Sequence, residues 1–321
     1  MSEEPNGEVD PPDLPSGDPG LGQSAPTERL EGPATEVVPP ATVGGRNLRV
    51  AIITGVGLAA LVLILIAIGP LPFFLLALVV LLMAQAEFYV SVRKGGYSPA
   101  AALGLVAGGV LLVGTFTRGE AAAGLVLFLT IVFSFVWFLA HERRGSVLAD
   151  ISVTLLGVAY VPLLGSFVGL ILRRGLNEGC TVSSITCDGR GIVIAVIGAA
   201  ALYDVFAYAA GSKFGKRAMA PRISPRKTIE GAVIATAAML IVGPPIASWL
   251  GPWNYGQAMV FVLLACVAAT MGDLAESMLK RDLDIKDMGA IFPGHGGALD
   301  RLDAILFVLL AGYLTLRLFN L

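Results

Sequence analysis

Charged residues are scarce in this chain: they make up 14% of it, where a soluble domain usually carries about 25%. Hydrophobic residues make up 55%, and the mean hydropathy is +0.78. The apolar residues also stand in long runs, which a soluble core does not need. This composition excludes an ordinary soluble domain and indicates an integral membrane protein.

Cysteine is also scarce, and no internal repeat is visible. Of the three cysteines, Cys266 lies in an apolar run and is expected in the core. Cys180 and Cys187 share one polar loop, where either a disulfide or two free thiols would fit. Which of the two holds depends on the side of the membrane on which this loop lies.

Residues 1–45 differ in composition from the rest of the chain. They hold nine of the 19 prolines and nine of the 24 acidic residues, with Arg29 as their single base. Such a segment cannot bury enough apolar surface to offset its ordering entropy. We therefore predict a disordered tail over 1–45, without a signal peptide, followed by a membrane domain over 46–321.

A membrane-spanning helix needs about 20 mainly apolar residues. The sequence predicts an all-α, polytopic membrane fold with about nine such helices, and the small residues in them favour close packing in lipid. The predicted spans are 48–69, 71–90, 98–117, 120–140, 148–172, 191–210, 230–250, 257–279 and 302–320.

The basic residues predict how these helices are oriented. With the N-terminus in the cytosol and the C-terminus outside, 17 of the 22 Lys and Arg residues fall on the cytosolic side. The five on the other side are Arg118, Arg173, Arg174, Arg190 and Arg317. This split predicts that every polar motif described below lies at the cytosolic face.

Charges within an apolar helix call for an explanation, because each costs at least about 2.5 kcal/mol at the bilayer centre. Asp273, Glu276 and Lys280 follow one another at spacings of three and four residues, which places them on one helical face. A buried ion pair that fixes helix packing would account for them. A binding site for a charged substrate is the alternative.

The next residues favour the binding site. Asp300 and Asp303 stand at the start of the last predicted helix, where they could act as caps. Glycines surround His295 and would allow backbone to approach a ligand closely. Carboxylates, bases and a glycine-rich turn are together what a Mg²⁺-bound polyphosphate requires.

A second polar cluster runs from Ser224 to Gly231 and reads S-P-R-K-T-I-E-G. Asp204, Tyr208 and the pair Gly215-Lys216 lie upstream of it. A cytosolic basic loop followed by a capped helix would explain part of this cluster. The combination of Ser-Pro, Lys-Thr and a glutamate inside the helix goes beyond such a loop.

The run from Ser277 to Asp303, S-M-L-K-R, K-D, P-G-H-G-G and D-R-L-D at fixed spacing, resembles the signature of the phosphatidate cytidylyltransferases, or CDP-diacylglycerol synthases. The segment Ser224–Gly231 is similar to that family's S-P-K-K-T-x-E-G block, with Arg226 in place of the usual lysine. The stretch from Asp204 to Lys216 is similar to the block before it. The resemblance is firm over about 200–303, the expected catalytic part.

The resemblance implies transfer of CMP from CTP to phosphatidate, which yields CDP-diacylglycerol and pyrophosphate. It implies Mg²⁺ held by Asp273 and Asp300, with a second ion that is divalent or monovalent. The expected catalytic residues are Asp273, Asp300, Lys280 and Lys227. The expected substrate-binding residues are Asp204, Ser224, Thr228, Glu230, Arg281, Lys286, Asp287, His295, Arg301 and Asp303.

The implied partners are CTP, phosphatidate and membrane lipids, with no nucleic acid, and small-residue helix faces also favour a homodimer. The expected location is a bacterial inner membrane. A membrane transporter and a CTP-dependent polyprenol kinase are the alternatives. The CDP-alcohol phosphatidyltransferase motif is absent, because Asp188-Gly189-Arg190 lacks its remaining residues. A structural scaffold would tolerate neutral residues at Asp273 and Asp300.

Overall fold

The computed structural model describes residues 48–141, 145–177, 189–289 and 296–321, with the side chains of 48–54 and 175–177 outside the described part. The chain divides into two units, Met1–Gly45 and Arg46–Leu321, and the fold below is that of the second. The predicted tail, the loop with Cys180 and Cys187, and His295 lie outside the described residues.

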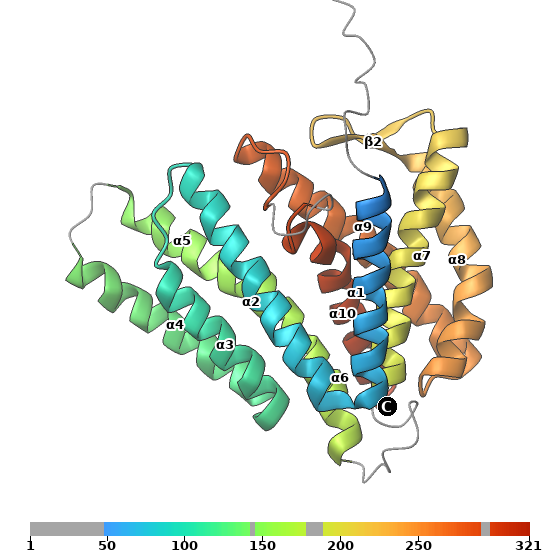
Figure 1. The fold of residues 1–321 in the computed structure, drawn as a ribbon, viewed down its shortest axis with the longest axis horizontal. Helices are drawn as coiled ribbons and strands as arrows, with labels where there is room; N and C mark the ends of the chain where they lie inside the picture. The colour runs from blue at the N-terminus through green and yellow to red at the C-terminus, as the bar shows by residue number, and fades with distance from the viewer. Residues whose placement is uncertain (1–47, 142–144, 178–188, 290–295) are drawn as a thin grey trace, which may run out of the picture. The chain divides into compact units, whose positions relative to one another are not determined.

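The second unit is a bundle of antiparallel helices with one small hairpin (Figure 1). The predicted all-α class is confirmed. The helices are α1 Leu48–Ile68, α2 Pro70–Lys94, α3 Ala101–Arg118, α4 Glu120–Ala140, α5 Val147–Val158, the π-helix η1 Ala159–Leu163, α6 Leu164–Asn177, α7 Arg190–Phe214, α8 Ile229–Leu250, α9 Tyr255–Asp282 and α10 Leu299–Leu318.

Seven segments of the described chain are long and apolar enough to cross a membrane. They are α2, α3, α4, the continuous stretch Val147–Arg174, α7, α8 and α9. α10 carries Asp300, Arg301, Asp303 and Arg317, and α1 is described only in part, so neither is counted. The multi-pass class is therefore confirmed, while the number nine stays a prediction.

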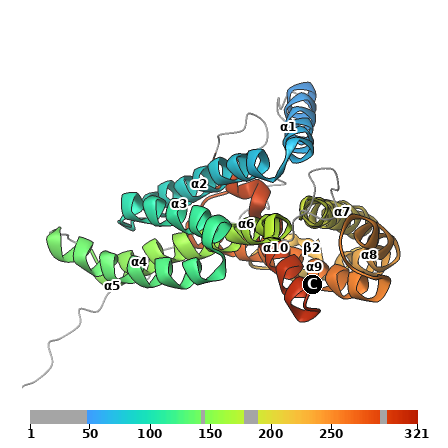
Figure 2. The ribbon, with the colours of Figure 1, turned by 90° about the horizontal axis from the view of Figure 1, so that it is seen from below.

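Large apolar side chains cover the outside of the bundle. Leu139 is 87% exposed and Trp249 77% exposed. Exposed apolar surface on this scale is expected where lipid rather than water is the solvent. Both views show α3, α4 and α5 at one side of the bundle and α7 and α8 at the other (Figures 1 and 2).

The segment predicted as one helix over 148–172 is helical throughout but contains one irregular turn. A single π-helical turn, η1, contains Pro162 between α5 and α6. Proline lacks the N–H of a regular helical hydrogen bond, so the helix changes its pitch there. The predicted span is confirmed as the stretch Val147–Arg174, and the π-helical turn inside it is what the sequence did not predict.

Two further differences concern polar segments. The loop before α8 contains an antiparallel hairpin, β1 Ala218–Ala220 and β2 Ser224–Thr228. Arg190, which the sequence placed in an outer loop, is the first residue of α7 and is 2% exposed. Its guanidinium donates to the carbonyl oxygens of Ile66 and Ala67, each at 3.0 Å. These carbonyls end α1 without a helical partner, and the arginine satisfies them.

Helix direction defines two ends of the bundle. The hairpin end contains β1, β2, the starts of α8 and α10, and the last turn of α9 (Figure 1). The opposite end contains the last residues of α3, α6 and α10 and the starts of α4 and α7. We call them the hairpin end and the opposite end.

Candidate active site

The segment Ser224–Gly231 forms β2 and the first turn of α8. Thr228 is the N-cap of α8, and its side chain accepts from the Gly231 N–H at 3.2 Å. Glu230 accepts from the N–H groups of Lys216 and Arg217, each at 3.0 Å. The capped-helix interpretation is therefore confirmed, and Glu230 also ties the first turn of α8 to the residues that follow α7.

Glycine is required where α7 approaches α8. A Cβ on Gly231 would lie 2.9 Å from the Gly211 Cα and 2.8 Å from the Thr228 Oγ1. A Cβ on Gly215 would meet the Gly211 carbonyl oxygen at 2.3 Å. These distances leave no room for a side chain, so the glycines of both blocks set the contact between the two helices.

Lys227 extends from β2 to α9, where its ammonium forms an ion pair with Asp273. The lysine side chain is 31% exposed and the aspartate 21%. Burial lowers the pKa of Lys227, while the nearby carboxylates of Asp204 and Asp303 act to raise it. The ion pair thus joins one residue from each of the two sequence clusters.

Lys280 forms the second group of ion pairs in the site, with Glu276 and Asp300. Its Nζ lies 2.7 Å from the Glu276 Oε2 and 2.6 Å from the Asp300 Oδ1. Glu276 is 1% exposed. The predicted shared face of Asp273, Glu276 and Lys280 is consistent with these contacts, and the buried ion pair is confirmed. Because Lys280 also contacts Asp300, the pair ties the end of α9 to the start of α10.

Asp300 is held by backbone as well. It accepts from the Gly297 N–H at 2.7 Å and from the Met288 N–H at 3.2 Å. The Gly297 contact spans three residues and fixes the turn before α10, but Asp300 is not its cap, because the N-cap of this helix is Ala298 and has no side-chain cap. Gly272 brings α9 close behind it, since a Cβ there would lie 2.3 Å from the Asp303 carbonyl oxygen.

Glu87 on α2 is a site residue that the sequence analysis missed. It is 5% exposed, and its Oε2 accepts from the Leu299 N–H at 3.0 Å. A Cβ on Gly289 or Gly297 would come within 2.2 or 2.5 Å of the same carboxylate. Ser91, one turn along, donates to the Met288 carbonyl oxygen at 2.6 Å. α2 therefore holds the backbone of Met288 and Leu299, two residues that lie before Asp300 in the chain.

A carboxylate inside an apolar helix was the signal for Glu87, because such a charge is costly in lipid. Tyr160, in η1, was also missed. It is 7% exposed, lies between the rings of Phe88 and Phe307, and has no hydrogen-bond partner for its hydroxyl among the described residues. Nothing in its local sequence marks it.

The other predicted residues lie at the hairpin end with fewer contacts. The Arg281 Nε donates to the Ile223 carbonyl oxygen at 3.2 Å, which ties α9 to the hairpin turn. Lys286 and Asp287 are exposed between α9 and α10. Ser224 begins β2 and is half-buried. The structure places these four residues beside the ion pairs without joining them to either pair.

An apolar cavity of about 430 Å³ lies among α1, α2, α6, α7 and α10. Its lining includes Ala77, Val193 and Leu302, and Arg301 contributes a charged group. Arg301 stands in the first turn of α10, beside Asp300. The cavity can therefore accept an apolar molecule whose anionic end lies at the hairpin end.

The donor set suits a hard metal ion, because Asp273, Glu276, Asp300 and Asp303 all supply carboxylate oxygens. Three of the four carboxylates are in contact with lysine ammonium groups. Within the ranges that the structure describes, no three His, Cys, Asp or Glu residues converge on one point. Donor chemistry thus fits Mg²⁺, with Asp273 and Asp300 as the predicted ligands.

Fold and site together define a multi-pass membrane protein with a lysine–carboxylate site at one end of its bundle. A family model described as the cytidylyltransferase family matches residues 49–319. The chain belongs to this family. Its membership confirms the resemblance that the two polar clusters indicated.

Named relatives cover most of the chain. The phosphatidate cytidylyltransferase of Mycobacterium leprae (strain TN) is 34% identical over 284 residues, which is 82% of this chain and 85% of that protein. The phosphatidate cytidylyltransferase of Bacillus subtilis (strain 168) is 31% identical over 293 residues, 85% of this chain and 99% of that protein. A Synechocystis relative of the same name is 29% identical over 279 residues.

Proposed function

We propose that this protein is a phosphatidate cytidylyltransferase, which transfers CMP from CTP to phosphatidate and releases pyrophosphate. One observation supports this most directly. Lys227 and Lys280, from the two sequence clusters, contact Asp273 and Asp300 at one end of the bundle. Similarity to relatives named for this reaction, over more than four fifths of the chain, supports the same proposal.

The reaction makes one P–O bond and breaks another. A phosphate oxygen of phosphatidate attacks the α-phosphorus of CTP, and the bond to the β-phosphate oxygen breaks as pyrophosphate leaves. The attacking oxygen is already ionised near neutral pH, so no general base is required. The main task of the protein is to bring two anions together, which is a matter of positioning and charge compensation.

Lys227 and Lys280 supply positive charge for that task. Each is held by carboxylates in the structure, so each ammonium is fixed in place before substrate binds. Arg281, Lys286 and Arg301 lie at the same end and are proposed as further phosphate contacts. Bound Mg²⁺, on Asp273 and Asp300, would add shielding of the phosphate charges.

The lipid substrate accounts for the apolar cavity. Phosphatidate has two acyl chains and an anionic phosphate, and the cavity offers an apolar lining with Arg301 as a charged group. Acyl chains in this cavity would place the phosphate near Arg301, one residue from Asp300. We further propose an inner membrane location, with the hairpin end cytosolic and a homodimer as the assembly.

The proposal is tested with purified protein supplied with CTP labelled at the α-phosphate, phosphatidate and Mg²⁺. Labelled CDP-diacylglycerol and free pyrophosphate are expected. Asp273→Asn and Asp300→Asn should each lower turnover by about a hundredfold or more. Asp282→Asn, at an exposed position on the last turn of α9, is the matched control and should keep wild-type turnover.

The alternatives give different products. A CTP-dependent lipid kinase would release CDP and leave the labelled phosphate off the lipid. A transporter would give neither product. Wild-type rates in both aspartate variants would refute the site, and absence of CDP-diacylglycerol from wild-type protein would refute the function.

A further inference from the structure

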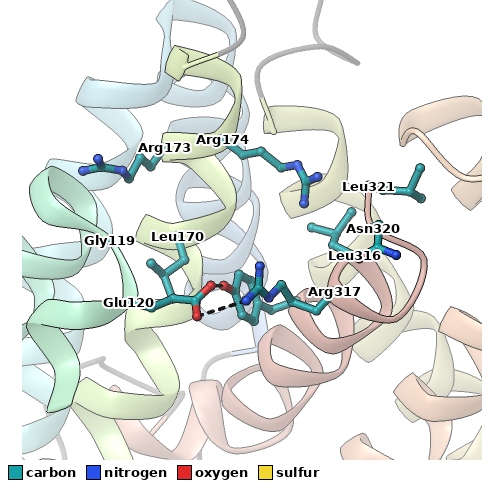
Figure 3. A pocket seen from close by; sticks show the side chains of 10 residues that line it. Gly119, Glu120, Leu170, Arg173, Arg174, Leu316, Arg317, Asn320 and Leu321 are labelled. Carbon is teal, nitrogen blue, oxygen red and sulfur yellow. Dashed lines mark hydrogen bonds and ion pairs between the residues drawn. The ribbon is translucent and has the colours of Figure 1, made fainter.

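A second cavity, with a partly polar lining, lies at the opposite end of the bundle, away from the lysine–carboxylate site. It has a volume of about 420 Å³ and is formed by the start of α4 and the last turns of α6 and α10 (Figure 3). Its lining residues are Gly119, Glu120, Leu170, Arg173, Arg174, Tyr313, Leu316, Arg317, Asn320 and Leu321. We call it the arginine pocket.

The side chains of the arginine pocket carry three positive charges and one negative charge. Glu120 lies 3.4 Å from an Nη of Arg317 and also accepts from the Tyr313 hydroxyl (Figure 3). The side chains of Arg317 and Glu120 are 63% and 51% exposed, so their ion pair is weak. A ligand anion can therefore compete with Glu120 for Arg317.

Arg173 is anchored on one side of the pocket. Its guanidinium donates to the Phe116 carbonyl oxygen at 3.3 Å, which orients it across the end of α3. Figure 3 shows Arg173 and Arg174 on the same helix end, with Arg317 on the neighbouring α10. A helix C-terminus favours basic side chains in its last turn, and Arg174 on α6 and Arg317 on α10 stand at such positions. Arg173 is a third guanidinium group that lines the same cavity.

The distribution of charge along the chain gives an independent argument. The predicted topology leaves five of the 22 bases on this side of the membrane, and three of the five line this one pocket. Bases on the outer side are disfavoured in polytopic proteins. Their concentration at a single cavity indicates a local role.

We propose that the arginine pocket binds a phosphate group, supplied either by the headgroup of an anionic phospholipid in the adjacent leaflet or by free phosphate. Guanidinium groups bind phosphate oxygens in pairs of parallel hydrogen bonds. The volume suits a headgroup or a small phosphate ester. Because the pocket lies at the opposite end from Asp273 and Asp300, the proposal does not depend on the CMP-transfer reaction.

The test measures lipid retention and thermal stability of the full chain in nanodiscs. One set contains phosphatidylcholine alone, a second contains one fifth phosphatidylglycerol, and a third contains phosphatidylcholine with millimolar inorganic phosphate. Wild-type protein should retain phosphatidylglycerol in native mass spectrometry and melt at a higher temperature in the second set. Stabilisation in the third set alone would identify free phosphate as the ligand.

Three variants separate the pocket from general surface charge. The double variant Arg173→Gln/Arg317→Gln should bind the anion about tenfold more weakly. Glu120→Gln removes the competing carboxylate and should bind it more tightly. Arg118→Gln, exposed at the same end but outside the lining, should bind as wild type.

Equal anion binding by the double variant and the wild type would overturn the proposal, as would weaker binding by Glu120→Gln. Absence of any stabilisation by phosphatidylglycerol or phosphate in the wild type would do the same. Melting in phosphatidylcholine alone shows whether each variant is folded. CMP transfer by Arg118→Gln should be unchanged.

Discussion

Replacing Glu87 by alanine should lower the CMP-transfer rate, although Glu87 lies on α2, which contains none of the residues predicted to bind substrate. The Leu299 N–H donates to this carboxylate at 3.0 Å, and Asp300 is the next residue. Removing the acceptor leaves a buried donor without this bond and opens space beside Gly289 and Gly297. The first turn of α10 would then lose a constraint that holds Asp300 in position.

The magnitude follows from the kind of bond that is lost. A hydrogen bond to a charged group contributes about 1.5–3 kcal/mol, and the unfolding free energy should fall by about that amount in Glu87→Ala. A displacement of Asp300 by about 1 Å would lower kcat by about a hundredfold. Glu87→Gln keeps the shape and an acceptor oxygen for Leu299, so we expect a smaller loss, about tenfold.

The assay compares kcat and KM for CTP with the melting temperature of each purified variant. Val90→Ala, at a 51% exposed position on the same helix, is the control and should change neither quantity. A purely structural role would lower the melting temperature and leave kcat per folded molecule unchanged. Wild-type kcat in folded Glu87→Ala would refute the positioning role.

Three further results are expected. Gly231→Ala should lower the unfolding free energy by about 1–3 kcal/mol, because its Cβ would lie 2.9 Å from the Gly211 Cα. Gly198→Ala, inside α7 and with open space around it, should melt at or above the wild-type temperature. Ala77→Phe should fill part of the apolar cavity and raise the KM for long-chain phosphatidate about tenfold, which is the cost of displacing about two methylene groups. Val79→Phe, at a 54% exposed position on the same helix, is the control and should leave this KM unchanged. Equal KM values for the two variants would contradict an acyl-chain role of the cavity. Tyr160→Phe should melt at or above the wild-type temperature, since the hydroxyl has no partner in the described part of the chain, and a loss of several degrees would show that it has one.

Several features of the candidate site could be predicted from local patterns in the sequence. The spacing of Asp273, Glu276 and Lys280 was enough to predict one charged helical face, because helical periodicity is a property of neighbours in the chain. Thr228, three residues before Gly231, had the position of an N-cap and is one. Burial of Cys266 likewise followed from its apolar surroundings.

Contacts between distant segments were beyond such patterns. The Glu87 contact with Leu299 spans 212 residues, and the Arg190 contacts with Ile66 and Ala67 span more than 120. Pro162 marks a missing helical N–H inside its apolar run, but a proline by itself does not predict that the helix continues through a π-helical turn. The number of spans stays a prediction, because α10 carries four charged residues and α1 is described only in part.

The sequence by itself determined that this protein is a polytopic membrane protein with polar clusters at 224–231 and 273–303, since apolar runs and residue spacing are read directly along the chain. Only the tertiary structure decided which charge faces which: Lys227 with Asp273, Lys280 with Glu276 and Asp300, and three arginines around one pocket at the opposite end. The physical reason is that ion pairs depend on distances of a few ångströms between helices, and those distances are set by how the helices pack, at contacts such as Gly231 against Gly211.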